Sequence, residues 1–380
     1  MAGVALIGYA SGAPVFAPVA FVDEAAIRRD PRFAGQLAEA ASLVLRAGAA
    51  EVLVVCIPFA PSPCELYASM HQAYGALGAA DFEIVVPLAV QYGRYASSYY
   101  TYGSLARVQR SALSFLARRL VALEMFDPGA AVPAYHDPFV WQLIEFLVDR
   151  DARGAPAHGV IGLDLETAAY DMRVWMRTNR PDLTAVLRAQ NVDFGHYLSI
   201  VVSDALYTFE GQLFSASAAS SYAGLMASLP YDATLTNSRI DGVASVDPAM
   251  SDSEALRAAR NGFVALTPSV RRGIVPYSAV TAAQESSPGY HLINSRLTFG
   301  IKRGLHVVLR ERLCSSRLPM KTDTVIARAV AQILDPYVSS GAIRQYDHKY
   351  EIRGSVLYVV VEAWRYGEVQ SLVVSVSVDI

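Results

Sequence analysis

Short apolar runs and stretches of helical periodicity alternate along the first half of the chain. Residues 4–9 and 52–57 are continuous apolar runs, which is typical of strands covered on both faces. Between them, residues 36–47 place apolar side chains on one helical face, and Gly48, a residue that commonly ends helices, follows. A helix between two buried strands indicates a parallel crossover unit.

The same alternation continues to about residue 202. Apolar spacing predicts further helices at residues 65–77, 105–126 and 139–150, and further strands at residues 82–87, 158–163 and 196–202. Helices that alternate with buried strands are typical of a parallel sheet with helices on both faces. We therefore predict a parallel-type α/β domain over residues 1–250.

The pattern changes near residue 214, where a helix of small residues begins. Beyond it we expect short strands at residues 261–266 and 274–280, helices at 290–313 and 321–337, and closing strands at 342–350, 355–364 and 370–380. These elements predict a smaller α+β domain over residues 251–368, followed by a terminal strand over residues 369–380. The fold class of the whole chain is thus α/β (α+β).

The composition indicates a large core and further buried contacts. The 380 residues are 53% hydrophobic and only 18% charged, which is more apolar than is usual for a lone soluble monomer and suggests subunit contacts. The net charge of −3 argues against a general polyanion binder, and no apolar run reaches the ~18 residues of a membrane helix. The three cysteines, Cys56, Cys64 and Cys314, argue against a disulfide framework and for folding in a reducing cytoplasm.

Motifs that would carry catalysis are not found in the sequence. There is no phosphate-binding loop, dinucleotide fingerprint, nucleophile elbow or metal-ligand pair at workable spacing. The acidic residues Asp164, Glu166 and Asp171 could bind a cation, but a solvated loop explains them more simply. The scattered histidines are more simply surface or core residues than bases: His71, His136, His158, His196, His291, His306 and His348. We expect no catalytic residue, no metal and no cofactor, although distant residues could still assemble a Ser/His/Asp triad.

A basic segment stands out at residues 290–317. Its six cationic side chains face a single acidic one, Glu311, in a chain that is slightly acidic overall. Such a helix could dock an acidic partner, either a protein or a nucleic acid, or it could simply present a solvated face. The six residues are Arg296, Lys302, Arg303, Arg310, Arg312 and Arg317.

The last strand, at residues 370–380, is β-branched and alternates apolar and polar residues near its end. It could pair within the sheet of its own molecule. It could also pair with the sheet of a neighbouring copy, because strand addition supplies a row of main-chain hydrogen bonds across an interface.

The order of these segments resembles the phage tail sheath family over nearly the whole chain. Residues 4–10 resemble the first core strand of the family, residues 18–23 the short segment after it, and residues 37–57 the following helix and strand. In the C-terminal third, residues 261–266 and 273–281 resemble two successive family strands, and residues 291–296 resemble the start of the long helix.

One feature departs from the family. Sheath subunits usually carry an N-terminal arm strand before the first core strand, whereas here the core strand is expected from residue 3 or 4. This suggests a subunit linked by its C-terminal arm alone, or a relative that caps or starts the sheath.

The resemblance implies a structural protein rather than an enzyme. It implies self-association into stacked hexameric rings around a tail tube, with baseplate and tail terminator proteins as further partners and contraction driving the tube through the host envelope. The protein would be assembled in the bacterial cytoplasm and would lie in the tail sheath of the virion, with no nucleic acid bound and no membrane insertion.

The resemblance also assigns roles to the two segments singled out above. The domain 1–250 would be the outer one and the domain 251–368 the inner one, with the six basic residues of 290–317 facing the tube. The terminal strand would be the inter-subunit arm, donated to a neighbouring subunit through Val369, Leu372, Val373, Val374, Ser375, Val376, Ser377 and Val378. The alternatives from other classes are an α/β hydrolase-like enzyme and a nucleic-acid-binding module that uses helix 290–317.

Overall fold

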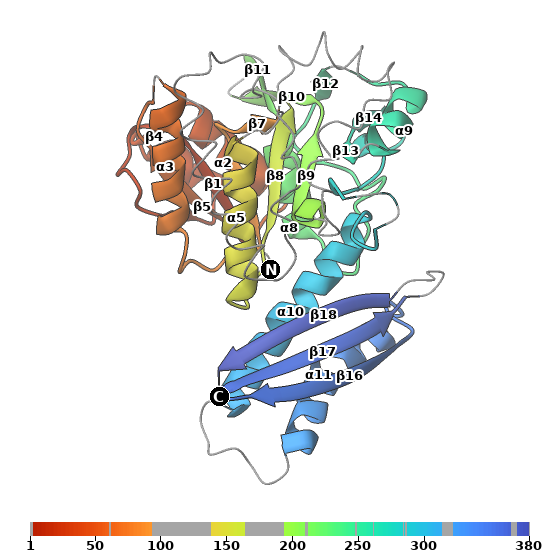
Figure 1. Cartoon of the computed structure of the whole chain (residues 1–380). Coiled ribbons are helices and arrows are strands. Elements are labelled where there is room, and N and C mark those ends of the chain that lie inside the picture. The colour runs from red at the N-terminus through yellow and green to blue at the C-terminus, as the bar shows by residue number, and fades with distance from the viewer. Residues whose placement is uncertain are drawn as a thin grey trace, which may run out of the picture.

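The computed structural model describes most of the chain, in two parts that share one long helix (Figure 1). The described residues are 3–60, 62–92, 138–163, 194–209, 212–247, 249–260, 262–283, 285, 287–313, 322–365 and 371–379. The predicted helix at 105–126, the acidic residues Asp164, Glu166 and Asp171, and Cys314 lie outside the described residues.

An eight-stranded sheet organises the larger part, which we call the α/β unit. Its strand order is β13 (Phe263–Val264), β9 (Leu198–Val201), β8 (His158–Leu163), β6 (Ile84–Pro87), β1 (Gly3–Tyr9), β5 (Glu51–Ile57) and β3 (Val19–Phe21), with β7 (Gln91–Tyr92) also paired to β8. Neighbouring strands are parallel, apart from β3, which runs antiparallel to β5. The predicted α/β class with a parallel sheet is therefore confirmed.

Helices cover both faces of this sheet because its strands are apolar on both sides. Within β1, Val4 and Leu6 join one core cluster and Ala5 and Ile7 join the other, as the two-residue repeat of a strand requires. The first face packs against α1 (Glu24–Arg29), α2 (Gln36–Arg46) and α8 (Ala219–Ser228). The second face packs against α3 (Pro63–Ala76), α5 (Pro138–Ala152) and α9 (Asp252–Arg260).

Short strands and turns complete the α/β unit. One small sheet contains β10 (Asp204–Phe209), β11 (Gln212–Ser217) and β12 (Ser245–Asp247), and β14 (Leu266–Ser269) forms a hairpin with β15 (Gly273–Pro276). Strand β2 (Ser11–Gly12) pairs with β4 (Phe33–Ala34), and the 3-10 turn η2 (Phe194–Tyr197) precedes β9.

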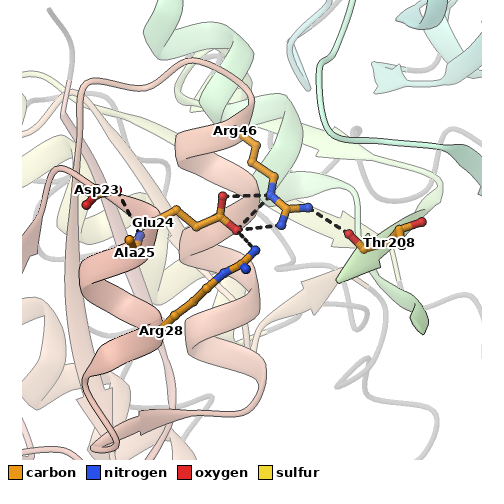
Figure 2. A network of polar contacts seen from close by, with 6 residues as sticks. All are labelled: Asp23, Glu24, Ala25, Arg28, Arg46 and Thr208. Atoms are coloured by element: carbon orange, nitrogen blue, oxygen red, sulfur yellow. Dashed lines mark hydrogen bonds and ion pairs between the residues drawn. The ribbon is translucent and has the colours of Figure 1, made fainter. Parts of the chain in front are cut away.

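A polar network ties α1 and α2 to the strand β10 (Figure 2). The Arg46 guanidinium lies 2.7 Å from Glu24 Oε1 and donates to the carbonyl of Thr208 at 3.0 Å, while Arg28 also donates to Glu24. Burial alone would raise the pKa of Glu24, but the hydrogen bonds from Arg46 and Arg28 outweigh it and lower that pKa. Asp23 caps the start of α1 by accepting from the backbone of Ala25.

The C-terminal lobe has a core of its own. It contains α11 (Thr322–Ser339), the antiparallel sheet of β16 (Gln345–Arg353), β17 (Val356–Trp364) and β18 (Ser371–Asp379), and much of α10 (Leu292–Leu313). Buried residues of these elements form a separate apolar cluster that begins at Leu297.

The predicted boundary between residues 250 and 251 is too early. The predicted strand at 261–266 divides into β13, which pairs with β9 in the large sheet, and β14, which pairs with β15. Helix α9 packs on the same sheet. Residues up to about 291 therefore belong with the α/β unit, and the division falls within α10.

Helices α2 and α8 approach each other closely because small residues face α2 from α8. A Cβ atom added at Gly224 would lie 2.5 Å from the carbonyl oxygen of Val44 and 2.7 Å from the Ala47 side chain. Backbone and a short side chain cannot move aside as a flexible side chain can, so any residue larger than glycine at this position forces the two helices apart.

The substitution Gly224→Ala should therefore lower the free energy of unfolding by about 1–3 kcal/mol through overpacking. The matched control is Gly75→Ala in α3, where an added Cβ meets nothing within 4 Å. The control should stabilise the protein by about 0.5–1 kcal/mol, because alanine suits a helix better than glycine does. Urea unfolding of both variants measures the two effects, and equal stabilities would contradict the close approach of α2 and α8.

Candidate assembly surfaces

Helix α10 connects the two parts of the molecule and carries most of the predicted basic surface (Figure 1). Near its start, Leu292 and Phe299 belong to the two cores of the α/β unit. From Leu297 onward, other residues of the same helix, such as Leu305 and Leu309, belong to the core of the C-terminal lobe. The two cores therefore share one continuous helix.

Arg296 is buried in the α/β unit rather than exposed. It is 5% exposed and donates to the carbonyl oxygens of Met226 at 2.9 Å and Leu229 at 2.6 Å. A third, longer bond reaches the carbonyl of Ala233 at 3.3 Å. Burial lowers the pKa of this guanidinium, and backbone carbonyls replace the water that the charge loses. The prediction that Arg296 faces a tube is wrong.

Lys302 binds the end of α5, and Arg303 binds the amino-terminal edge of the large sheet. Lys302 Nζ lies 2.7 Å from Asp151 Oδ1, and Arg303 Nη1 lies 2.6 Å from Asp81 Oδ1. Arg303 also donates to the carbonyl oxygens of Phe82 and Pro156, at 2.6 and 3.0 Å, just before β6 and β8 begin. Both side chains are less than one-fifth exposed, so in this structure their charges are used mainly within the molecule.

A glycine allows α10 to lie against the end of α5. Gly154 has a φ of +74°, a conformation that glycine adopts readily, and an added Cβ there would lie 2.1 Å from the ring of His306. Tyr197 adds a further contact, because its hydroxyl donates to Asp151 at 2.6 Å while its ring stacks on Phe299. Charge, aromatic packing and a close backbone approach thus fix α10 on the α/β unit.

The distal end of α10 keeps part of the predicted basic surface. Arg310 and Arg312 are both exposed there, and Arg312 donates to Gln332 of α11. Arg317 lies outside the described residues. The six predicted residues therefore separate into three that hold the molecule together, two that lie on its surface and one that is not described.

Strand β18 pairs with its own molecule in this structure. It runs antiparallel to β17 in a continuous register of nine pairs, from Val356–Asp379 to Trp364–Ser371, with Val374 opposite Val361. Of the two pairings that the sequence allowed, the structure therefore shows the one within the chain. Val369 of the predicted arm lies outside the described residues.

The two faces of β18 differ sharply. Leu372, Val374, Val376 and Val378 are at most 3% exposed and pack into the core of the C-terminal lobe. Val373, Ser375 and Ser377 on the other face are exposed. The arm prediction includes residues of both faces, and in this structure every second one packs into the core of its own lobe.

The three-stranded sheet ends in two edge strands. Within the described part of the chain, β17 is the central strand, and the outer edges of β16 and β18 have no further strand beside them. A groove of about 560 Å³ lies against this sheet and is lined by residues that include Lys302, Lys349, Arg353 and Tyr358. Unpaired strand edges are common sites of association between protein chains.

A buried histidine–serine pair is the nearest approach to catalytic chemistry in the described residues. His158 Nε2 lies 2.9 Å from Ser199 Oγ, as in a base–nucleophile pair. However, Ser199 is fully buried, and its hydroxyl lies 3.1 Å from the carbonyl of Val280, to which it donates. Burial, His196 and Arg296 lower the pKa of His158 to about 3, and none of these influences is a carboxylate that would orient the ring. The contact supports a structural role for the pair.

The described residues also bear on the cysteine, the metal and the membrane predictions. Cys56 is a buried free thiol whose pKa is raised by burial. Among the described residues, no group of three or more His, Cys, Asp or Glu side chains is placed to hold a metal ion. No described helix combines the length and the apolar character that crossing a membrane requires.

The contacts of α10 predict unequal effects for two arginines on one helix. The substitution Arg296→Met should lower the free energy of unfolding by about 2–4 kcal/mol, because it leaves buried carbonyl oxygens without donors. Arg310→Met, on the exposed end, should change it by less than about 0.5 kcal/mol. Urea unfolding compares the two, and a near-neutral Arg296→Met variant would contradict the buried placement.

One of three comparisons with known proteins identifies the fold. No protein-family model matches the chain, and no curated protein matches it either. The solved structures do: a sheath tail protein from Listeria innocua has a TM-score of 0.66 and 12% identity, over 100% of this chain and 95% of that one. A sheath tail protein from Desulfitobacterium hafniense has a TM-score of 0.63 and 10% identity, over 100% and 97%.

The helical sheath of the anti-feeding prophage, in its contracted state, matches as well. Its TM-score is 0.58 at 9% identity, over 100% of this chain and 90% of that chain. At such low identity the likeness establishes the fold, and the expected resemblance is confirmed at that level. This chain therefore has the tail sheath protein fold over its whole length.

Proposed function

We propose that this protein is a structural, non-enzymatic subunit of a contractile sheath, which polymerises with copies of itself as stacked hexameric rings around an inner tube. The observation that carries the proposal is the match of the whole chain, both parts included, to sheath proteins. A shared domain alone would be weak support, because one fold serves many functions. Here the shared feature is the α/β unit, the connecting helix and the C-terminal lobe in one arrangement.

The proposal extends to partners and location. Chains in structures of the anti-feeding prophage baseplate match this chain too, which supports a baseplate as a partner. We propose that a tube protein and a tail terminator protein complete the set. In this proposal the sheath is assembled in the bacterial cytoplasm, belongs to a phage-type tail and drives the tube through the host envelope. A cap or initiator subunit of the same tail is the nearest alternative.

The terminal strand is proposed as the link between copies. Two chains could exchange β18, so that each strand pairs with β17 of its neighbour in the register that it now has in its own chain. Such an exchange keeps every contact of the strand and changes only the molecule to which it belongs. Main-chain pairing of this kind suits a contact that must persist while subunits turn.

The distal end of α10 is proposed as the tube-facing surface. Arg310 and Arg312 remain exposed there, and Arg317 follows in the sequence. Charged surfaces of this kind can separate without exposing large apolar patches, which suits a contact that contraction must break.

Electron microscopy of the purified protein tests the central proposal. We expect tubules with regular striations and six-fold rings in end views, formed without added nucleotide. Dispersed monomers at every concentration and ionic strength tested would contradict self-assembly.

Charge reversal tests the tube-facing surface. The variant Arg310→Glu should form tubules alone but lose binding to its tube protein in co-sedimentation, because repulsion replaces attraction. Arg271→Glu, on an exposed turn of the α/β unit, is the matched control and should bind as the wild type does. Equal tube binding by both variants would refute the assignment.

A further inference from the structure

Strand β18 occupies in its own molecule the place that the proposed strand exchange would give to the β18 of a neighbour. We infer that this self-pairing acts as a brake on assembly: the free subunit blocks its own acceptor edge on β17 and polymerises only after β18 opens. The inference rests on the proposed function, which it extends from the assembled state to the free subunit.

The register shows why one strand can fill the site in two ways. All nine residues of β18 have a partner on β17, from Ser371 opposite Trp364 to Asp379 opposite Val356. The β18 of a second copy is chemically identical and would make the same nine pairs. Own and neighbouring strands therefore compete for one site with equal intrinsic contacts, and the balance depends on protein concentration and on the other contacts between copies.

Release of β18 from β17 costs free energy and restricts which segment can take its place, because β18 is part of the core of the C-terminal lobe. Leu372, Val374, Val376 and Val378 are at most 3% exposed, and they pack with Leu357, Val359, Val361 and Ala363, which are fully buried on β17. An opened subunit exposes both apolar rows to water. It can regain this burial only with a segment that repeats the apolar alternation of β18.

The position of β18 makes opening feasible without unfolding the sheet. In the described part of the chain it is an edge strand, so its release breaks one ladder and leaves the pairing of β16 with β17 intact. Its outward residues Ser375 and Ser377 are polar and exposed, so no second apolar layer covers them. Opening therefore breaks one ladder and exposes the four core side chains of β18 together with the part of α10 that packs on them.

A reversible covalent lock tests the inference. Val360 and Ser375 lie opposite each other on β17 and β18, on the face turned away from the core. Directly opposed residues have Cβ atoms ~4.5–5.5 Å apart, and a small shift of the strands brings them to the ~3.5–4.5 Å that a disulfide requires. The double variant Val360→Cys/Ser375→Cys, oxidised as a dilute monomer, should keep β18 on its own sheet. The single variants Val360→Cys and Ser375→Cys are the matched controls.

The brake predicts that the oxidised double variant loses tubule formation and that a reductant restores it to the level of the single variants. It also predicts that tubules grown under reducing conditions and then oxidised contain disulfides between copies, visible as a ladder on a non-reducing gel. Assembly of the oxidised monomer at the rate of the reduced one would overturn the inference. So would disulfides that stay entirely within single chains in assembled tubules.

A second lock and the reduced controls separate the possible failures. Tyr358→Cys/Ser377→Cys applies the same restraint two residues along the ladder and should give the same result; assembly of this oxidised variant would equally overturn the brake. If the wild type and the reduced single variants form no tubules, the proposed sheath function itself fails. If they assemble and both oxidised locks assemble equally well, the sheath function stands and the brake alone is refuted.

Discussion

The burial of one helix in two cores is the constraint on which the rest of the molecule depends. Helix α10 contributes Phe299 to the α/β unit and Leu305 and Leu309 to the C-terminal lobe. Between these contacts, Arg303 binds Asp81 at the amino-terminal edge of the large sheet, and Lys302 binds Asp151 at the end of α5. A helix held at so many points along its length cannot bend without breaking several contacts. The orientation of the C-terminal sheet, and of any strand it offers to a neighbour, is set by this junction.

The parts of the fold that the sequence predicts well depend on local periodicity. The strand at 158–163 and the helix near 36–47 were predicted within one residue, because buried strands and amphipathic helices leave continuous patterns. The domain boundary was wrong because β13 spans only two residues. Such a short run has no period that could show which sheet it joins.

The basic helix shows why a candidate surface is harder to predict than an element. Sequence places six cations on 290–317, but it does not show that carbonyl oxygens near residue 230 and carboxylates at 81 and 151 lie opposite three of them. These partners are distant in sequence and meet only through the fold. The terminal strand has the same ambiguity: its alternation of apolar and polar residues suits pairing with either molecule, and the structure shows the pairing within the chain.

Two kinds of contact thus have distinct physical roles in the proposed sheath. The strand ladder of β18 can pass from one molecule to another without losing pairs, whereas exposed charges such as Arg310 can be separated at little cost. Both depend on a C-terminal lobe that stays fixed to the α/β unit. Native-state hydrogen exchange in increasing urea tests that coupling most directly. We expect the amides of β17 that bond to β16, and those of β1 in the large sheet, to open with free energies within about 1 kcal/mol of each other, in one cooperative unit. Opening of these β17 amides several kcal/mol below β1, with its own dependence on urea, would show that α10 does not join the two cores and would contradict the account.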